Sequence, residues 1–182
     1  PGNEIPEERK IEIQQVLDLY TEKMFAVMGQ SGFDLAMGEF LLDLAVGTAV
    51  MLIQPGDEAT PIRYTAVPTY HISFEEGPNG TVDAVYRKLS RPFAVVDREW
   101  PDADIPDELR KEFEEDPTQK IELLEATYYV DGTVHYCLLP FQKDYKIVHR
   151  TMKSFPWVIS RYMKASNERY GRGPVLYALP DI

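Results

Sequence analysis

The side chains suited to nucleophilic or metal chemistry are the single cysteine, Cys137, and three histidines, His71, His135 and His149. His135 and Cys137 are two residues apart in a predicted strand, so they share one face of it. A cysteine–histidine pair can activate a nucleophile, but a small core thiol beside an edge histidine explains the same spacing and is favoured. The histidines lack the spacing of zinc ligands, so no metal and no cofactor are predicted.

Other motifs of enzymes are missing from the sequence. There is no G-x-S-x-G turn, no Walker A loop and no G-x-G-x-x-G fingerprint. The acidic pairs Glu75–Glu76 and Glu114–Glu115 are adjacent, so their side chains diverge and suit general acid–base work poorly. A protein without catalytic activity is therefore the first hypothesis. The alternative is a small-molecule-binding or hydrolytic α+β domain that uses the His135/Cys137 region.

The formal net charge is −11, which argues against tight, sequence-independent DNA binding. The charge is uneven: residues 143–172 carry eight Lys or Arg against two acids, so the rest of the chain holds −17. Either both regions are solvated surfaces, or opposite patches meet between copies of the chain. The second hypothesis makes Arg161, Arg169 and Arg172 subunit-interface residues, with acidic residues of 102–125 as their partners.

The basic region also carries aromatic residues, a combination that can hold single-stranded nucleic acid by stacking. A structural role is favoured over this one because the flanking chain is acidic. The residues concerned are Arg161, Tyr162, Lys164, Arg169 and Tyr170.

Length and composition indicate an ordinary globular protein. The 182 residues suffice for one domain with a core, and 44% of them are apolar. No apolar run reaches 18 residues, so no membrane partner is expected. A lone cysteine forms no internal disulfide, and this usage indicates an intracellular origin.

The predicted fold class is α+β. Apolar periodicity predicts helices over 4–28 and 31–45, each with a face that should pack in a core, and Gly47 ends the second. Short strands bounded by turn signals follow, with hairpins at Gly77–Gly80 and Asp131–Gly132 and a short acidic helix over 107–115. We therefore expect a helical pair packed on the domain (1–47), a small antiparallel β-barrel or sandwich (48–159) and a final turn (160–182), in one compact domain.

The final turn is the most distinctive stretch. Gly171, Gly173 and Pro174 predict a rigid structural turn over 170–174. The run ERYGRGPVLYALPDI resembles a hallmark of the portal proteins, or head-to-tail connectors, of podovirus-type phages. Three weaker matches occur in the same order: FLLDLAVGTAVMLI (40–53), EEGPNGTVDAVYRK (75–88) and FPWVISR (155–161).

The resemblance implies a structural virion protein without catalysis, in a fragment that includes chiefly the wing region. It implies a homo-oligomeric ring of about a dozen copies at the portal vertex of the capsid. Further implied partners are the terminase motor, tail adaptor proteins and double-stranded DNA passing through the ring during packaging and ejection. During assembly, or as a prophage product, the protein would be in the host bacterial cytoplasm. In the family, a long helical stem follows the turn and is absent here; another virion or tail adaptor protein is a further alternative.

Overall fold

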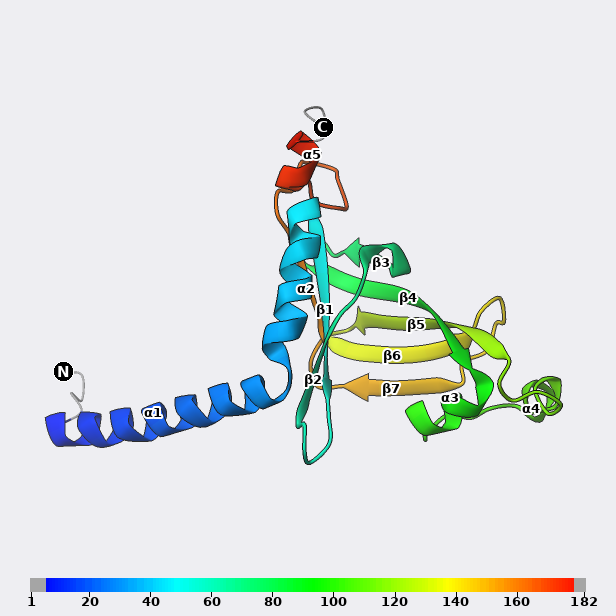
Figure 1. Cartoon of the computed structure of the whole chain (residues 1–182), viewed down its shortest axis with the longest axis horizontal. Helices are drawn as coiled ribbons and strands as arrows, with labels where there is room; N and C mark the ends of the chain where they lie inside the picture. The colour runs from blue at the N-terminus through cyan, green and yellow to red at the C-terminus, as the bar shows by residue number, and fades with distance from the viewer. Residues whose placement is uncertain (1–5, 179–182) are drawn as a thin grey trace.

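A computed structural model of the chain describes residues 6–178 and has the expected α+β class (Figure 1). Two helices lead, and antiparallel strands follow in two sheets. Within the described residues neither sheet closes on itself, so the fold is a sandwich and not a barrel. The elements are α1 (Glu7–Gln30), α2 (Phe33–Val46), β1 (Thr48–Pro55), β2 (Ile62–Ala66), η1 (Thr69–His71), β3 (Ile72–Glu76), β4 (Val82–Pro92), α3 (Phe93–Glu99), α4 (Asp107–Glu112), β5 (Lys120–Val130), β6 (Thr133–Pro140), β7 (Val148–Met152), β8 (Trp157–Arg161) and α5 (Pro174–Ala178).

The smaller sheet has the strand order β2-β1-β8 and is the middle layer of the molecule. Side chains of β1 alternate between its two faces. Ala49 and Met51 pack against Ala36 and Phe40 of α2, whereas neighbouring β1 residues pack toward the larger sheet. This second contact forms a core cluster of Val50, Leu52, Val67, Ile72, Phe74, Val85 and Trp157. The central strand is thus buried on both faces, which accounts for its apolar sequence.

The larger sheet has the order β3-β4-β5-β6-β7. Asp131 and Gly132 both have positive φ, of 49° and 77°, which is the backbone of a tight two-residue hairpin. One face of this sheet packs against the smaller sheet at one end and against α3 and α4 at the other. The predicted acidic helix is α4, and α3 was not predicted.

The packing of α1 differs from the prediction. The helix projects from the body, and none of its 24 residues is buried (Figure 1). Its apolar stripe was expected to pack in a core, but of the two leading helices only α2 packs on a sheet. The apolar periodicity of α1 is present, but within residues 6–178 no other element buries it. None of the helices in the described residues is long and apolar enough to span a membrane.

The junction of α1 and α2 also differs in detail. Residue 31 was expected to begin the second helix, but Ser31 caps the end of α1 instead, and its hydroxyl donates to the Val27 carbonyl over 2.7 Å. Gly32, with φ of 71°, begins α2, and Gly47 ends α2 as predicted. The division into segments 1–47, 48–159 and 160–182 stays a prediction.

Candidate assembly surface

The predicted turn packs against the junction between α2 and β1. Gly173 donates its N–H to the Val46 carbonyl over 3.0 Å, and Gly171 donates to the Thr48 hydroxyl over 2.7 Å. Arg172 donates to the Met163 carbonyl, and together these bonds fasten the turn on both sides. We call residues 170–174 the elbow. It orients α5, the short helix that Pro174 begins.

Glycine is required in the elbow by close approach. A Cβ on Gly173 would overlap the Ala45 carbonyl oxygen, and a Cβ on Gly171 would overlap the carbonyl oxygen of Gly47. Gly171 and Gly173 are therefore where the backbone meets the end of α2 directly. The last residues of the ALPDI run lie outside the described residues.

Arg161, one predicted interface residue, is used inside the chain. Its guanidinium forms an ion pair with Glu76, and Lys164 donates to the same carboxylate over 2.6 Å. Bonding from Lys164 and then from Arg161 lowers the pKa of Glu76 below its ordinary value. This cluster attaches the end of β8 to β3.

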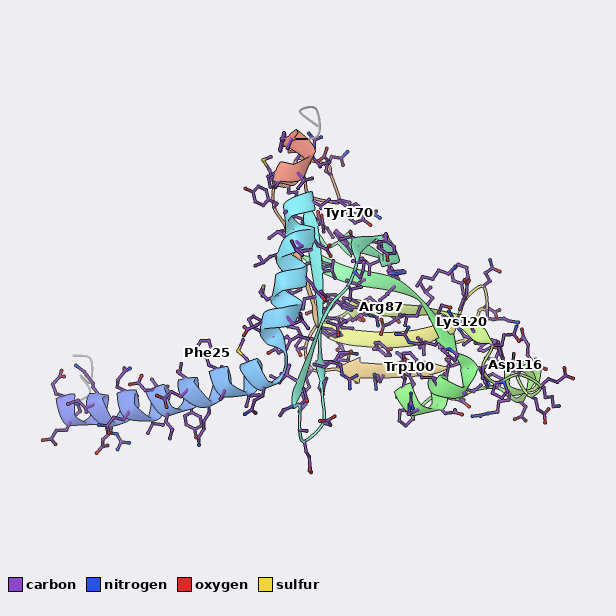
Figure 2. All side chains as sticks on the ribbon, viewed as in Figure 1. Phe25, Arg87, Trp100, Asp116, Lys120 and Tyr170 are labelled. Carbon is purple, nitrogen blue, oxygen red and sulfur yellow. The ribbon has the colours of Figure 1, made fainter. Side chains whose placement is uncertain are left out.

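Arg169 and Arg172 are exposed beside the elbow. Arg172 pairs locally with Glu168, with Nε 2.9 Å from Oε2. Tyr170 donates to the Ile72 carbonyl over 3.2 Å and packs edge-on against Phe74 (Figure 2). The structure thus uses Tyr170, Arg161 and Lys164, three of the residues considered for stacking nucleic acid, to hold the fold together.

Exposed apolar side chains concentrate on the helices. Fifteen of the 23 exposed large apolar residues among those described belong to α1, α2 and α5. Phe25 of α1, for example, is 67% exposed (Figure 2). We call this set the helical apolar surface: Ile11, Ile13, Val16, Leu17, Leu19, Tyr20, Met24, Phe25, Leu35, Leu41, Leu42, Val46, Val175, Leu176 and Tyr177. The concentration of exposed apolar side chains on these helices makes them a candidate surface for contact with another protein.

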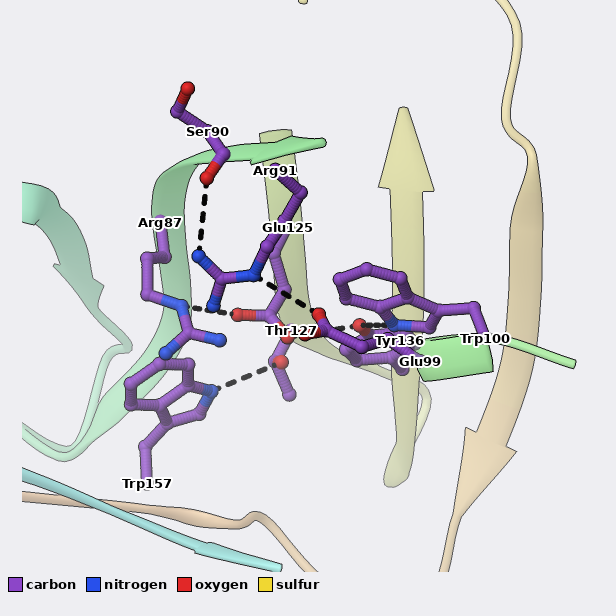
Figure 3. Close-up of polar contacts among 9 residues, drawn as sticks. All are labelled: Arg87, Ser90, Arg91, Glu99, Trp100, Glu125, Thr127, Tyr136 and Trp157. Carbon is purple, nitrogen blue, oxygen red and sulfur yellow. Dashed lines mark hydrogen bonds and ion pairs between the residues drawn. The ribbon is translucent and has the colours of Figure 1, made fainter. Parts of the chain in front are cut away.

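A buried polar chain crosses the larger sheet and was missed by sequence reasoning (Figure 3). Trp100 Nε1 donates to Tyr136 Oη over 2.7 Å, and Tyr136 donates to Glu125 Oε1 over 2.9 Å. Arg87 Nε lies 2.6 Å from Glu125 Oε2, and the Glu125 side chain is 2% exposed. Burial, followed by the charge of Glu125, raises the pKa of Tyr136, which therefore stays a proton donor.

This buried chain has a positioning role. Trp100 follows α3 directly, so its bond to Tyr136 attaches α3 to the sheet. The four side chains come from β4, the end of α3, β5 and β6, and no local sequence signal connects them.

In the His135/Cys137 region, His135 pairs with another histidine and not with Cys137. His135 Nδ1 lies 3.1 Å from His149 Nε2, because β6 and β7 are neighbours. Cys137 is 1% exposed, and its sulfur lies 3.4 Å from Tyr128 Oη. The thiol is therefore closed off from substrate in this conformation. His71 lies apart, with its ring tilted against that of Tyr70.

Comparison with protein families decides what kind of protein this is. The model of the family described as bacteriophage head to tail connecting protein matches residues 1–182. The chain belongs to this family. No curated protein matches the chain. The resemblance drawn from the elbow motif is thereby confirmed at the level of the family.

The connector is a structural protein of the phage particle, placed at the capsid vertex where head and tail join. For such a protein the surfaces that matter are those that contact other subunits. The elbow, the exposed arginines Arg169 and Arg172, and the helical apolar surface are the candidates that this connector offers.

Proposed function

We propose that this connector is a portal subunit, of which about a dozen copies form a ring at one capsid vertex. Double-stranded DNA passes through the ring when a terminase motor packages the genome and again at ejection. Tail adaptor proteins bind its outer side. Assembly takes place in the bacterial cytoplasm. Family membership supports the position between head and tail. The exposure of α1 is the observation that supports ring formation.

The main stripe of α1 has the spacing of a helix-contact seam. Ile13, Leu17, Tyr20 and Met24 alternate at intervals of four and three residues, and all are exposed. This interval keeps apolar side chains on one narrow face, which suits packing against another helix. Exposing this apolar face to water costs about 25 cal/mol of free energy per Å² of apolar area. The stripe therefore requires a partner.

We infer that the partner is a neighbouring copy. In a ring each subunit offers one surface and receives the neighbour's surface on another. The projecting α1 is shaped to reach beyond its own body, and the outer face of α2 offers Leu35, Leu41 and Leu42 as a receiving surface. Because offering and receiving surfaces differ, the contact repeats head to tail, and we propose that the rotation between neighbours closes the assembly into a ring.

The distribution of charge also supports a head-to-tail contact between neighbouring copies. Arg169 is exposed, and so is Arg172 despite its local pairing with Glu168, and we propose that both meet acids of 102–125 on the neighbour. Arg161 is committed to Glu76 and is left out. The net charge of −11 suits a conduit, since a surface without dense positive charge does not hold the phosphate backbone.

The test is ring formation by two matched double variants of the full connector. L17Q/M24Q places two amides on the seam, whereas I11Q/L19Q places two amides on other faces of the same helix. We expect L17Q/M24Q to abolish rings in negative-stain electron micrographs while I11Q/L19Q keeps them. Equal ring yield from both variants would show that the seam is no subunit contact.

A further inference from the structure

A hollow ringed by arginines lies where the two sheets and α3 meet. Its volume is about 560 Å³, within the range of roughly 300–1,000 Å³ that is typical of ligand sites. Five arginines line it, from β2, β4, α3 and β7: Arg63, Arg87, Arg91, Arg98 and Arg150. Only two carboxylates, Glu99 and Glu125, line it as well. Because Asp102 pairs with Arg150 from outside the lining, two of the five positive charges are left in excess, in a protein whose net charge is −11.

Three of these arginines have partners that fix them in place. Arg87 is held by Glu125 at 2.6 Å, and Arg91 is held by Glu99 at 3.1 Å (Figure 3). Arg150 lies 3.8 Å from Asp102 and stacks over the Tyr136 ring at 4.6 Å. The buried chain described above thus also holds one wall of the hollow in place. Arginines held in this way are preorganised to bind a ligand.

The other two arginines are uncompensated. Among residues 6–178, neither Arg63 nor Arg98 has an acidic side chain within ion-pair distance. Both are exposed, and they approach the hollow from opposite elements, β2 and α3. Like charges gathered around one space repel each other, and an anion within that space removes the repulsion.

We infer that this hollow binds a phosphate-bearing anion. Guanidinium groups match phosphate oxygens with paired, charge-assisted hydrogen bonds. A compact group with two or more negative charges meets arginines from several sides at once, which one carboxylate of a neighbouring subunit does not. Gln54 and Thr65 add polar groups to the lining. The phosphate groups come either from a free phosphate compound or from a nucleic-acid backbone.

The experiment uses the full connector with inorganic pyrophosphate as the probe, titrated by calorimetry at low salt. The pocket variant is R63Q/R98Q, and the control variant R9Q/K143Q removes the same two charges from exposed side chains that do not line the hollow. We expect R63Q/R98Q to weaken pyrophosphate binding by at least about tenfold, and the control to leave it unchanged. Thermal melts of both variants verify that each is folded.

The source of the phosphate is identified in the same assay. Competition by a short single-stranded DNA at comparable phosphate concentration assigns the hollow to nucleic acid, and absence of competition assigns it to a free phosphate compound. Pyrophosphate binding that is absent, or equal in all three proteins, overturns the proposal. Loss of rings in R63Q/R98Q with unchanged pyrophosphate binding also overturns it, because the hollow is then a subunit contact.

Discussion

The backbones of Gly47 and Gly171 lie so close that a Cβ on either residue would overlap the carbonyl oxygen of the other. One glycine ends α2, and the other belongs to the elbow 124 positions later in the chain. This contact holds α5 beside the end of α2. The direction in which the chain leaves the domain thus depends on two residues without side chains.

Gly171→Ala should destabilise the fold by about 2–4 kcal/mol, because the Gly47 carbonyl group and Arg161 must move to admit the methyl group. Gly38→Ala is the matched control. Nothing lies within 4 Å of a Cβ at Gly38, inside α2, so this change should stabilise by about 0.5–1 kcal/mol. Urea unfolding followed by circular dichroism measures both. A Gly171→Ala protein as stable as wild type would mean that the elbow is not packed as described.

The buried chain of polar side chains predicts that a single substitution lowers the free energy of unfolding much more than a matched double substitution. Glu125→Gln should cost about 3–5 kcal/mol, since it leaves Arg87 buried without its counter-charge. Replacing both residues together, as Arg87→Met with Glu125→Leu, should cost clearly less. Free energies of unfolding from urea titrations provide the comparison. Costs that simply add would show that the two side chains are not coupled.

Glu76 makes stability depend on pH in a defined direction. Its pKa is lowered in the folded protein by bonding from Lys164 and Arg161, so its contribution is present above the unfolded value, roughly 4.3. The contribution is lost as the pH falls through the lower, folded value. The Glu76→Gln variant should therefore have a lower melting temperature than wild type at pH 7, and this difference should shrink below about pH 4. Glu115→Gln, at an exposed position, should follow wild type throughout.

The enzymatic alternative is tested by the reactivity of the only cysteine. Cys137 is 1% exposed, so a thiol reagent should label it only as fast as the fold opens. Labelling should therefore accelerate sharply in mild denaturant. Rapid labelling of the native protein, with a rate that rises around a pH well below 8, would indicate an activated thiol and favour the hydrolytic alternative.

The sequence predicted strands and turns well because their signals are local. The apolar run at 48–54 and the Asp131–Gly132 turn each specify their own backbone. The environment of α1 was not predictable, because periodicity shows that a face must be covered but not which chain covers it.

The functional residues, too, were predictable only where the sequence signal is local. The elbow was predicted from its own amino-acid sequence. The buried polar chain was not, because sheet register is what brings together Trp100, Tyr136, Glu125 and Arg87. The arginine hollow likewise draws on β2, β4, α3 and β7, which are distant in the sequence.

A photo-cross-link from the α1 seam tests the central claim most directly. Tyr20, 61% exposed, is replaced by a benzophenone amino acid, and isotopically heavy and light connectors are mixed before irradiation. Mass spectrometry then identifies the cross-linked peptides. We predict heavy–light pairs that join α1 of one copy to another copy of the same chain. Rings that form normally but give only cross-links within one chain would contradict the proposal that α1 joins neighbouring subunits.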